Sequence, residues 1–264
     1  MADLTQELLD IAYGAGEKIM AYYGSDLAVT SKTDDSPLTK ADLAAHHHIV
    51  DALAQLTPDI PVISEESAQA VAHDIRADWA RFWLVDPLDG TKEFIKQTGS
   101  FTVNIGLVEH GIPSVGIVHA PATGITYVAS PEGGAKKIAA PGQTPAPIAA
   151  TTASLPDPPR IVASRDHAGP AVTALLAKLH GAECLSIGSS LKFCLVAEGA
   201  ADIYLRDVPT MEWDTAAAHA VVLAAGAKLV VHPGHTPLAY NKPDLRNPSI
   251  VTATDQGLAL LKSI

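Results

Sequence analysis

The feature that most constrains the fold is a change of rhythm in the middle of the chain. Between residues 101 and 139, short apolar runs alternate with turn sequences rich in Gly, Pro and Ser, which is typical of an antiparallel meander. Residues 141–159 contain six prolines, and beyond them strands and helices follow one another, as in α/β proteins. The sequence therefore predicts an α+β fold with two units: residues 1–150 on an antiparallel sheet, and residues 159–264 of α/β type.

The spacing of apolar residues predicts the individual elements. Helical spacing indicates helices over residues 4–23 and 40–56, and apolar runs that stop at acidic residues indicate buried strands at 60–63 and 82–85. The second half gives strands at 160–163, 184–187, 201–205, 227–231 and 249–252, and helices near 168–180, 189–198, 213–225 and 254–262. Elements in this order predict helices and sheets stacked in layers.

Composition limits the functional classes. A formal net charge of −11 without a basic stripe argues against binding of a nucleic-acid polymer. The apolar runs are shorter than the roughly 18 residues that span a bilayer, and the acidic N-terminus does not resemble a signal peptide. We expect a cytoplasmic protein with no integral membrane segment; peripheral attachment to the inner membrane and the oligomeric state stay open. Cys184 and Cys194 are too few for a disulfide framework, and we expect both to be buried, reduced thiols.

The segment 83–94, WLVDPLDGTKEF, carries the clearest chemical signal. An apolar strand ends at Asp86, Pro87 is expected to stop further strand pairing because it has no N–H group, and Asp89 follows. Two carboxylates beside a sharp turn can bridge a pair of hard cations, which prefer oxygen ligands. Because Asp-x-x-Asp-Gly is also common in turns, a structural Asx turn is an alternative.

The same turn offers groups that could bind a phosphoryl anion. We expect it to aim the Leu88 carbonyl into the space beside the two carboxylates. Gly90 and Thr91 then open a predicted helix, and helix N-termini bind phosphate through their first N–H groups. Metal ligands and phosphate donors are therefore expected from one short stretch.

Two other places bring acids to the end of a predicted element. Glu65 and Glu66 directly follow the strand PVIS, and Asp214 begins a helix of small residues. Each has an ordinary explanation, the first as a solvated loop and Asp214 as a helix N-cap. Together with the 83–94 segment, however, they place acids where α/β proteins gather ligands, which predicts one shared site.

These motifs resemble those of the inositol monophosphatase superfamily of metal-dependent phosphatases. The matching segments are EE at 65–66, DPLDGT at 86–91 and WDTAA at 213–217, and the resemblance covers essentially the whole chain. Within the superfamily the chain is most similar to the bacterial 3′(2′),5′-bisphosphate nucleotidases of the CysQ type, through DSPLTKAD at 35–42, WLVDPLDGTKEFI at 83–95, SFTVNIGLV at 100–108 and SIGSSLKFCLVAEG at 186–199. The resemblance implies a layered αβαβα sandwich of the inositol monophosphatase and carbohydrate phosphatase type.

The resemblance also implies that the cofactor is Mg²⁺. One ion would be held by Glu65, Asp86 and the Leu88 carbonyl, and a second by Asp86, Asp89 and Asp214. Clustered carboxylates repel one another, and bound cations would offset that repulsion.

A third, weaker ion is implied near Glu66, which we count among the catalytic groups. The resemblance further implies that Asp42 and Thr91 orient and deprotonate the attacking water. Asp42 also lies three residues after Thr39, the expected N-cap of the helix at 40–56, so a structural role as a capping residue is an alternative.

The matching positions in the nucleotidases imply the substrate contacts. Ser189 and Lys192, three apart and therefore expected on one face of a helix, would contact the nucleotide and its non-scissile phosphate. Arg206 would lie beside that phosphate and His167 near the base, whereas a merely solvent-facing role is the alternative for Lys192. The predicted substrate site comprises Glu65, Leu88, Asp89, Gly90, Thr91, His167, Ser189, Lys192, Arg206 and Asp214.

The resulting hypothesis is Mg²⁺-dependent hydrolysis of adenosine 3′,5′-bisphosphate to AMP and phosphate. Its sulfated relative is a further candidate substrate, and the resemblance implies a role in sulfur assimilation. One rival is an inositol or sugar monophosphatase on the same scaffold, and another is a non-catalytic metal or nucleotide sensor. Glu212 departs from the apolar residues common at this position in the superfamily, and an additional acid there could alter metal affinity.

Overall fold

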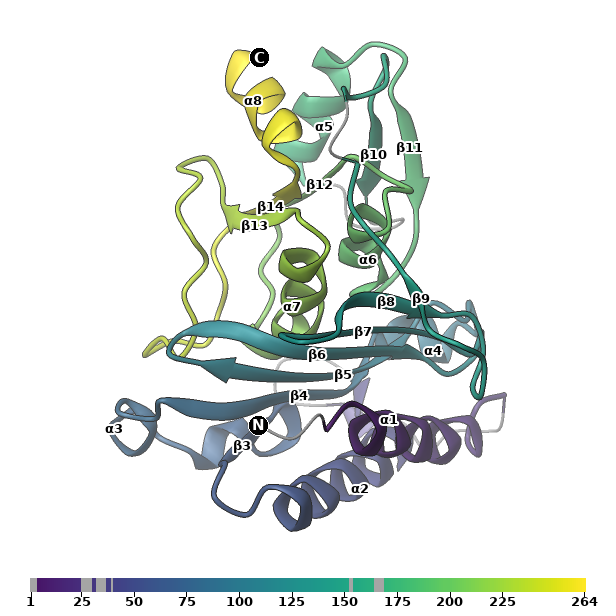
Figure 1. The fold of residues 1–264 in the computed structure, drawn as a ribbon, viewed down its shortest axis with the longest axis vertical. Helices are drawn as coiled ribbons and strands as arrows, with labels where there is room; N and C mark the ends of the chain where they lie inside the picture. Colours follow the sequence, from purple (N-terminus) through teal and green to yellow (C-terminus); the bar gives the residue numbers. More distant parts are fainter. Residues whose placement is uncertain (1–3, 25–29, 32–36, 39, 152–153, 164–168) are drawn as a thin grey trace.

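Five layers of helices and sheets make up the molecule (Figure 1). The computed structural model describes residues 4–24, 30–31, 37–38, 40–151, 154–163 and 169–264. One outer layer consists of α1 (Thr5–Met20) and α2 (Lys40–Leu56), the middle layer of α6 (Leu191–Ala197) and α7 (Ala216–Ala224), and the other outer layer of α5 (Pro170–Lys178) and α8 (Asp255–Ser263). A sheet separates each pair of helical layers, which confirms the expected αβαβα sandwich.

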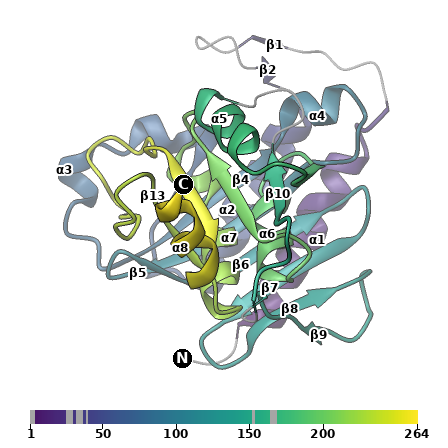
Figure 2. The ribbon, with the colours of Figure 1, turned by 90° about the horizontal axis from the view of Figure 1, so that it is seen from above.

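The first sheet has seven strands in sequence order. They are β3 (Val62–Ser64), β4 (Arg81–Asp89), β5 (Thr102–Glu109), β6 (Ile112–Ala120), β7 (Ile125–Ser130), β8 (Gly134–Ile138) and β9 (Ala146–Pro147). Only β3 and β4 pair in parallel; the others form the antiparallel meander that the turn sequences predicted. Two strands of a separate ribbon, β1 (Thr30–Ser31) and β2 (Pro37–Leu38), lie at the edge of the layers near α4 (Thr91–Ile95) (Figure 2).

The second sheet has five strands in the order β11-β10-β12-β14-β13. Their bounds are Arg160–Ala163 for β10, Glu183–Ser186 for β11, Ile203–Arg206 for β12, Lys228–Val231 for β13 and Ile250–Ala253 for β14. Strand β10 is parallel to both of its neighbours, whereas β14 is antiparallel to β12 and β13. The sheet is therefore mixed, although the elements follow the predicted α/β order.

Both faces of the first sheet are buried, because helices cover each of them. Along β4, Phe82 and Leu84 belong to the hydrophobic cluster around α7, whereas Trp83 and Val85 belong to the cluster under α1 and α2. Successive side chains of a strand point to opposite faces, so a strand buried on both faces appears in the sequence as the continuous apolar run seen here.

Helix α7 rests directly on the backbone of the first sheet. Gly106 and Gly116 pair across β5 and β6, and an added Cβ at Gly106 would lie only 2.7 Å from the backbone nitrogen of Ala217; the approach at Gly116 to the Ala217 carbonyl is closer still. Glycine at both positions allows this contact. The residues just before α7, including Asp214, are thereby placed beside the end of β4.

Two sequence expectations were wrong. Pro87 does not end the ladder: β4 continues to Asp89, which pairs with Thr102 after a shift in register beyond Asp86, and such an irregularity tolerates a residue without an N–H group. Cys184 is exposed on the edge strand β11, while Cys194 is buried as expected. None of the helices within the described ranges is long and apolar enough to cross a lipid bilayer.

Candidate active site

Most of the predicted site residues line one pocket of about 440 Å³. The pocket is lined by the end of β4 and the start of α4. The turn before α6 and the segment between β12 and α7 also contribute to its walls. The predicted residues along its walls are Glu65, Asp86, Leu88, Asp89, Gly90, Thr91, Ser189, Lys192, Arg206 and Asp214. His167 lies outside the described residues.

Asp86 forms the deepest part of the acidic wall. It is buried, and its Oδ1 accepts a hydrogen bond of 3.0 Å from the Leu88 N–H. Burial raises the pKa of Asp86 well above its ordinary value, and the nearby charges of Glu65, Asp89, Asp214 and Asp42 raise it further. Ionisation of this carboxyl therefore costs free energy unless a cation compensates it.

Asp89 accepts hydrogen bonds from neutral donors in the turn before α6. Its Oδ2 accepts hydrogen bonds of 2.7 Å from the Ser189 hydroxyl and 2.7 Å from the Ser190 N–H. The Ser190 hydroxyl donates in turn to Asn104 Oδ1 at 2.7 Å, and Thr102 contacts both serines. These contacts fix the orientation of Asp89 without neutralising its charge.

Asp214 lies in the short 3₁₀ turn Glu212–Asp214 that precedes α7. Its Oδ2 accepts a hydrogen bond of 2.8 Å from the Met211 N–H, so it caps its own turn rather than α7, which follows Thr215. Burial raises the pKa of Asp214 well above its ordinary value, and the charges of Asp89 and Glu65 add to the effect. The helix-cap explanation does not account for so many acids in one place.

The acidic wall suits divalent cations by its chemistry. The carboxylates of Glu65, Asp86, Asp89 and Asp214 line one pocket, which Glu93 also lines, and the charges of neighbouring acids raise the pKa of Asp86 and of Asp214. In the described ranges no three His, Cys, Asp or Glu side chains are already grouped around one point as metal ligands. The carboxylates therefore line the same wall without being arranged as a complete set of metal ligands. Hard cations, which prefer oxygen ligands, would balance their negative charge.

The three predicted catalytic groups lie at different depths. Thr91 is the first residue of α4, and its hydroxyl donates to the Leu88 carbonyl at 3.3 Å; the preceding Gly90 has φ +90°, the left-handed conformation that favours glycine at this sharp turn. Asp42 is buried in the first turn of α2, behind the pocket wall but close enough for its charge to raise the pKa of Asp86. Glu66 is not among the pocket residues, and its charge acts on His46. Thr39, the expected cap, lies outside the described residues.

The same pocket has a cationic wall, formed by Lys192 and Arg206. Lys192 is 5% exposed, so the solvent-facing alternative was wrong. Its Nζ donates to the Ser189 carbonyl at 2.6 Å and lies 5.7 Å from the centre of the Tyr204 ring. The pKa of Lys192 is lowered to about 8, chiefly by burial; the charge of Asp89 opposes this shift and the charge of Arg206 adds to it.

Ser189 departs from its predicted place. We expected it on one face of a helix with Lys192, but α6 begins at Leu191 and Ser189 lies in the turn before it, with φ +58°. The turn still brings Ser189 and Lys192 to the same pocket. A left-handed conformation is unusual for a residue with a side chain, and such strain is common at functional sites.

Comparison with known proteins shows the family of the chain. The sequence profile of the inositol monophosphatase family matches residues 1–262. The chain belongs to the inositol monophosphatase family. The 3′(2′),5′-bisphosphate nucleotidase CysQ of Escherichia coli (strain K12) is 47% identical over 226 residues, which are 85% of this chain and 89% of that protein.

Solved structures show the same family architecture. The crystal structure of CysQ from Bacteroides thetaiotaomicron, a bacterial member of the inositol monophosphatase family, superimposes with a TM-score of 0.83 at 39% identity and covers 96% of this chain and 98% of that chain. The extragenic suppressor protein suhB from Bartonella henselae gives a TM-score of 0.80 at 22% identity over 99% of this chain and 98% of that chain. The second likeness shows the fold alone.

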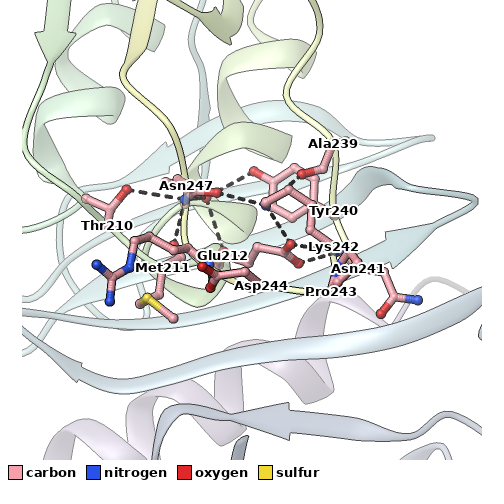
Figure 3. A network of polar contacts seen from close by, with 12 residues as sticks. Thr210, Met211, Glu212, Ala239, Tyr240, Asn241, Lys242, Pro243, Asp244 and Asn247 are labelled. Atoms are coloured by element: carbon pink, nitrogen blue, oxygen red, sulfur yellow. Dashed lines mark hydrogen bonds and ion pairs between the residues drawn. The ribbon is translucent and has the colours of Figure 1, made fainter. Parts of the chain in front are cut away.

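Glu212, the residue that departs from the superfamily pattern, does not line the pocket of this family member. Its carboxylate is fully buried and accepts hydrogen bonds from the Asn241 N–H at 2.7 Å, the Lys242 N–H at 3.0 Å and Lys242 Nζ at 2.6 Å (Figure 3). The acid is thus compensated by a lysine of the chain. A direct effect of its charge on bound metal is correspondingly reduced.

Sequence reasoning missed the residues that support Asp89. Thr102, Asn104 and Ser190 are buried polar groups in the hydrogen-bond network described above. A signal for two of them was present: Thr102 and Asn104 are two residues apart in an otherwise apolar strand, so they point to the same face. Buried polar residues of this kind need partners.

Proposed function

We propose that this chain is a Mg²⁺-dependent 3′(2′),5′-bisphosphate nucleotidase that hydrolyses adenosine 3′,5′-bisphosphate to AMP and phosphate. The observation that carries the proposal is one pocket that has both an acidic wall, from Asp86, Asp89 and Asp214, and a cationic wall, from Lys192 and Arg206. The high identity to relatives named as bisphosphate nucleotidases supports it. A substrate with two phosphates can occupy both walls at once.

Two Mg²⁺ ions would occupy the acidic wall. Glu65, Asp86 and the Leu88 carbonyl would hold one, and Asp86, Asp89 and Asp214 would hold the other. When bound, such ions stabilise negative charge on phosphoryl and leaving oxygens and make water a stronger acid at neutral pH. A third ion beside Glu66 remains a prediction; Glu66 follows Glu65 in the chain but is not among the residues that line the pocket.

Thr91 and Asp42 would prepare the attacking water. The Thr91 hydroxyl proton points to the Leu88 carbonyl, so the lone pairs of the hydroxyl oxygen are available to accept a hydrogen bond from water. Asp42, in the first turn of α2, is near enough for its charge to act on Asp86, and it would receive the proton as water attacks. Gly90 and Thr91 begin α4, whose N–H groups favour the scissile phosphate.

Lys192 and Arg206 would bind the phosphate that is not cleaved. Lys192 is fixed by the Ser189 carbonyl and Arg206 by the Val208 carbonyl at 3.1 Å. Both cations are therefore oriented before the substrate arrives, which lowers the entropy cost of binding. A sugar or inositol monophosphate has no second phosphate for this wall.

The test is phosphate release from adenosine 3′,5′-bisphosphate and from inositol 1-phosphate, each measured with Mg²⁺ and after its removal by a chelator. We expect Mg²⁺-dependent turnover with a clear preference for the nucleotide in kcat/KM. A preference for inositol 1-phosphate would assign the chain to the rival monophosphatase function. Binding of both compounds without turnover would assign it to the sensor function.

A further inference from the structure

A loop far along the chain supports the segment that carries Asp214. The Asn247 N–H donates to the Thr210 carbonyl at 2.7 Å, the Glu212 N–H donates to the Leu245 carbonyl at 2.9 Å, and Met211 and Arg246 form an antiparallel bridge. Residues 210–212 and 245–247 thus form a short two-stranded ladder (Figure 3). The ladder ends two residues before Asp214.

The side chain of Asn247 brackets Asp214 on both sides. It is 3% exposed, and its Nδ2 donates to the Met211 carbonyl at 2.8 Å and to Thr215 Oγ1 at 3.1 Å. One contact precedes Asp214 and the other follows it. A single amide therefore fixes the chain at both ends of the turn that presents the Asp214 carboxylate.

Lys242 joins Asn247 to Glu212. Its Nζ donates to Glu212 Oε1 at 2.6 Å and to Asn247 Oδ1 at 3.2 Å. Glu212 also accepts the backbone N–H groups of Asn241 and Lys242, so it holds the 241–242 part of the loop. The three side chains form one connected network around the turn (Figure 3).

The network acts on the pocket without entering it. Thr210 and Asp214 line the pocket, whereas Glu212, Lys242 and Asn247 are not among its described lining residues. The Met211 N–H donates to Asp214 Oδ2, and the carbonyl of the same peptide group, that of Thr210, accepts from the Asn247 N–H. The position of this peptide group therefore influences the direction of the Asp214 carboxylate. We propose that Glu212, Lys242 and Asn247 are positioning residues that fix Asp214 for binding Mg²⁺; the proposal rests on the proposed function of Asp214 as a metal ligand.

A matched pair elsewhere in the fold provides the control. Asp202, like Glu212, has a side chain with 0% exposure that accepts from a backbone N–H and from a partly exposed cation, here Arg160 at 2.8 Å. This pair lies at β10 and β12 in the second sheet and does not line the pocket. Asp202→Asn therefore removes the same kind of interaction without touching the turn of Asp214.

The experiment measures Mn²⁺ binding to metal-free protein by the electron paramagnetic resonance signal of the free ion, with no substrate present. Mn²⁺ is the probe because it takes the same oxygen ligands as Mg²⁺. We expect Lys242→Met and Asn247→Asp to weaken binding about tenfold, the usual effect of removing a group that orients a metal ligand. The Mg²⁺ concentration for half-maximal activity should rise by the same factor, while KM for the bisphosphate at saturating Mg²⁺ stays unchanged.

These two variants separate positioning from long-range charge. Lys242→Met removes a positive charge and Asn247→Asp adds a negative one, so electrostatics alone would strengthen cation binding in both. Weakened Mn²⁺ binding in both, with unchanged binding in Asp202→Asn, supports the proposal. Unchanged or tighter binding in either variant, or equal weakening in Asp202→Asn, overturns it.

The readouts also keep this proposal separate from the proposed function. Wild-type protein that binds Mn²⁺ but does not hydrolyse the bisphosphate would contradict the function while the binding comparison still decides the role of the network. Because Lys242 has a side-chain exposure of 23%, Lys242→Met is the variant least at risk of misfolding. It decides the question alone if Asn247→Asp does not fold.

Discussion

Asp202 and Glu212 are buried beside cations of the chain, whereas Asp86, which is buried, and Asp214, which is half-buried, lie beside other carboxylates. The first two accept charged hydrogen bonds of 2.8 Å from Arg160 and 2.6 Å from Lys242. The second two have their pKa raised by burial and then by neighbouring acids. The difference distinguishes acids whose negative charge is balanced by a lysine or arginine of the protein from acids whose charge would be balanced by a cation from solution.

This comparison assigns roles that the sequence alone left mixed. Glu212 and Asp214 are two residues apart, and both appeared to be candidates for influencing a metal. In the fold the Glu212 carboxylate accepts a hydrogen bond from Lys242, whereas Asp214 lines the pocket. A buried acid is therefore evidence for a metal site only when its neighbours do not already neutralise it.

The largest expected effect is on catalysis. Asp89→Asn keeps an oxygen that can accept from Ser189 and Ser190 but removes the negative charge, so the fold should persist while metal binding fails. We expect kcat to fall at least about a thousandfold, because metal ions contribute several kcal/mol to such reactions. The measurement is kcat with the bisphosphate at saturating Mg²⁺, with circular dichroism to confirm folding. Activity within tenfold of wild type would place the reaction elsewhere.

Stability should respond in opposite directions for the two kinds of acid. Asp202→Asn should destabilise the protein by about 2 kcal/mol, less than the roughly 3 to 5 kcal/mol for breaking a fully buried pair, because Arg160 is partly exposed. Asp86→Asn should stabilise the metal-free protein by about 1 kcal/mol, because it removes a desolvated charge, and the neighbouring charges that act on it, within the described part of the chain, are all those of acids.

The sign for Asp86 follows from its raised pKa. The folded state binds the proton of this carboxyl more tightly than the unfolded state does, so stability falls as pH rises above the unfolded value near 3.8. Asp86→Asn should abolish that loss and also abolish stabilisation by Mg²⁺. Chemical denaturation at pH 7, with and without Mg²⁺, measures both; a loss of stability in metal-free Asp86→Asn would break the comparison.

Local sequence patterns predicted most of the fold and the acids of the pocket, whereas the family resemblance implied the roles of Ser189, Lys192 and Arg206. Strand 82–85 and the acids that follow it could be predicted because a run of apolar residues and the carboxylates after it are neighbours in the sequence. The continuation of β4 through Pro87 could not be predicted, because it depends on a shift in the pairing register against Thr102. The direction of β14 likewise depends on pairing with distant strands.

Contacts between distant segments explain the parts of the site that were not predicted. Lys242 and Asn247 are separated from Asp214 by the whole of α7 and β13, and no local pattern links them to it. Ser189 was assigned to a helix because of its spacing to Lys192. In the structure it has a left-handed backbone conformation and donates a hydrogen bond to Asp89, which lies 100 residues away in the sequence. The division into units at 1–150 and 159–264 remains a prediction, and one hydrophobic cluster includes Phe82 and Val221 from both.

A smaller effect is expected for substrate preference. Lys192 is a buried cation held by carbonyl groups, so it can be neutralised by a phosphate of the substrate just as the acids can be by metal. Lys192→Met should lower kcat/KM for adenosine 3′,5′-bisphosphate roughly fiftyfold, since hydrogen bonds to charged groups contribute about 1.5 to 3 kcal/mol. Turnover of a small phosphate monoester with one phosphate should change less than about threefold. Equal losses for both substrates would show that Lys192 serves the fold or the metal site.

The smallest expected effect is a pH dependence of substrate binding. Burial lowers the pKa of Lys192 to about 8, so the ammonium is present below that pH and is lost above it. The KM for the bisphosphate should therefore rise roughly three- to tenfold between pH 7 and pH 9, following the loss of the charged form. Lys192→Arg provides the control, because a guanidinium does not titrate in this range. If KM rises equally in wild type and in Lys192→Arg, another group causes the pH dependence. Lys192 would then not be a buried cation whose charge controls substrate binding.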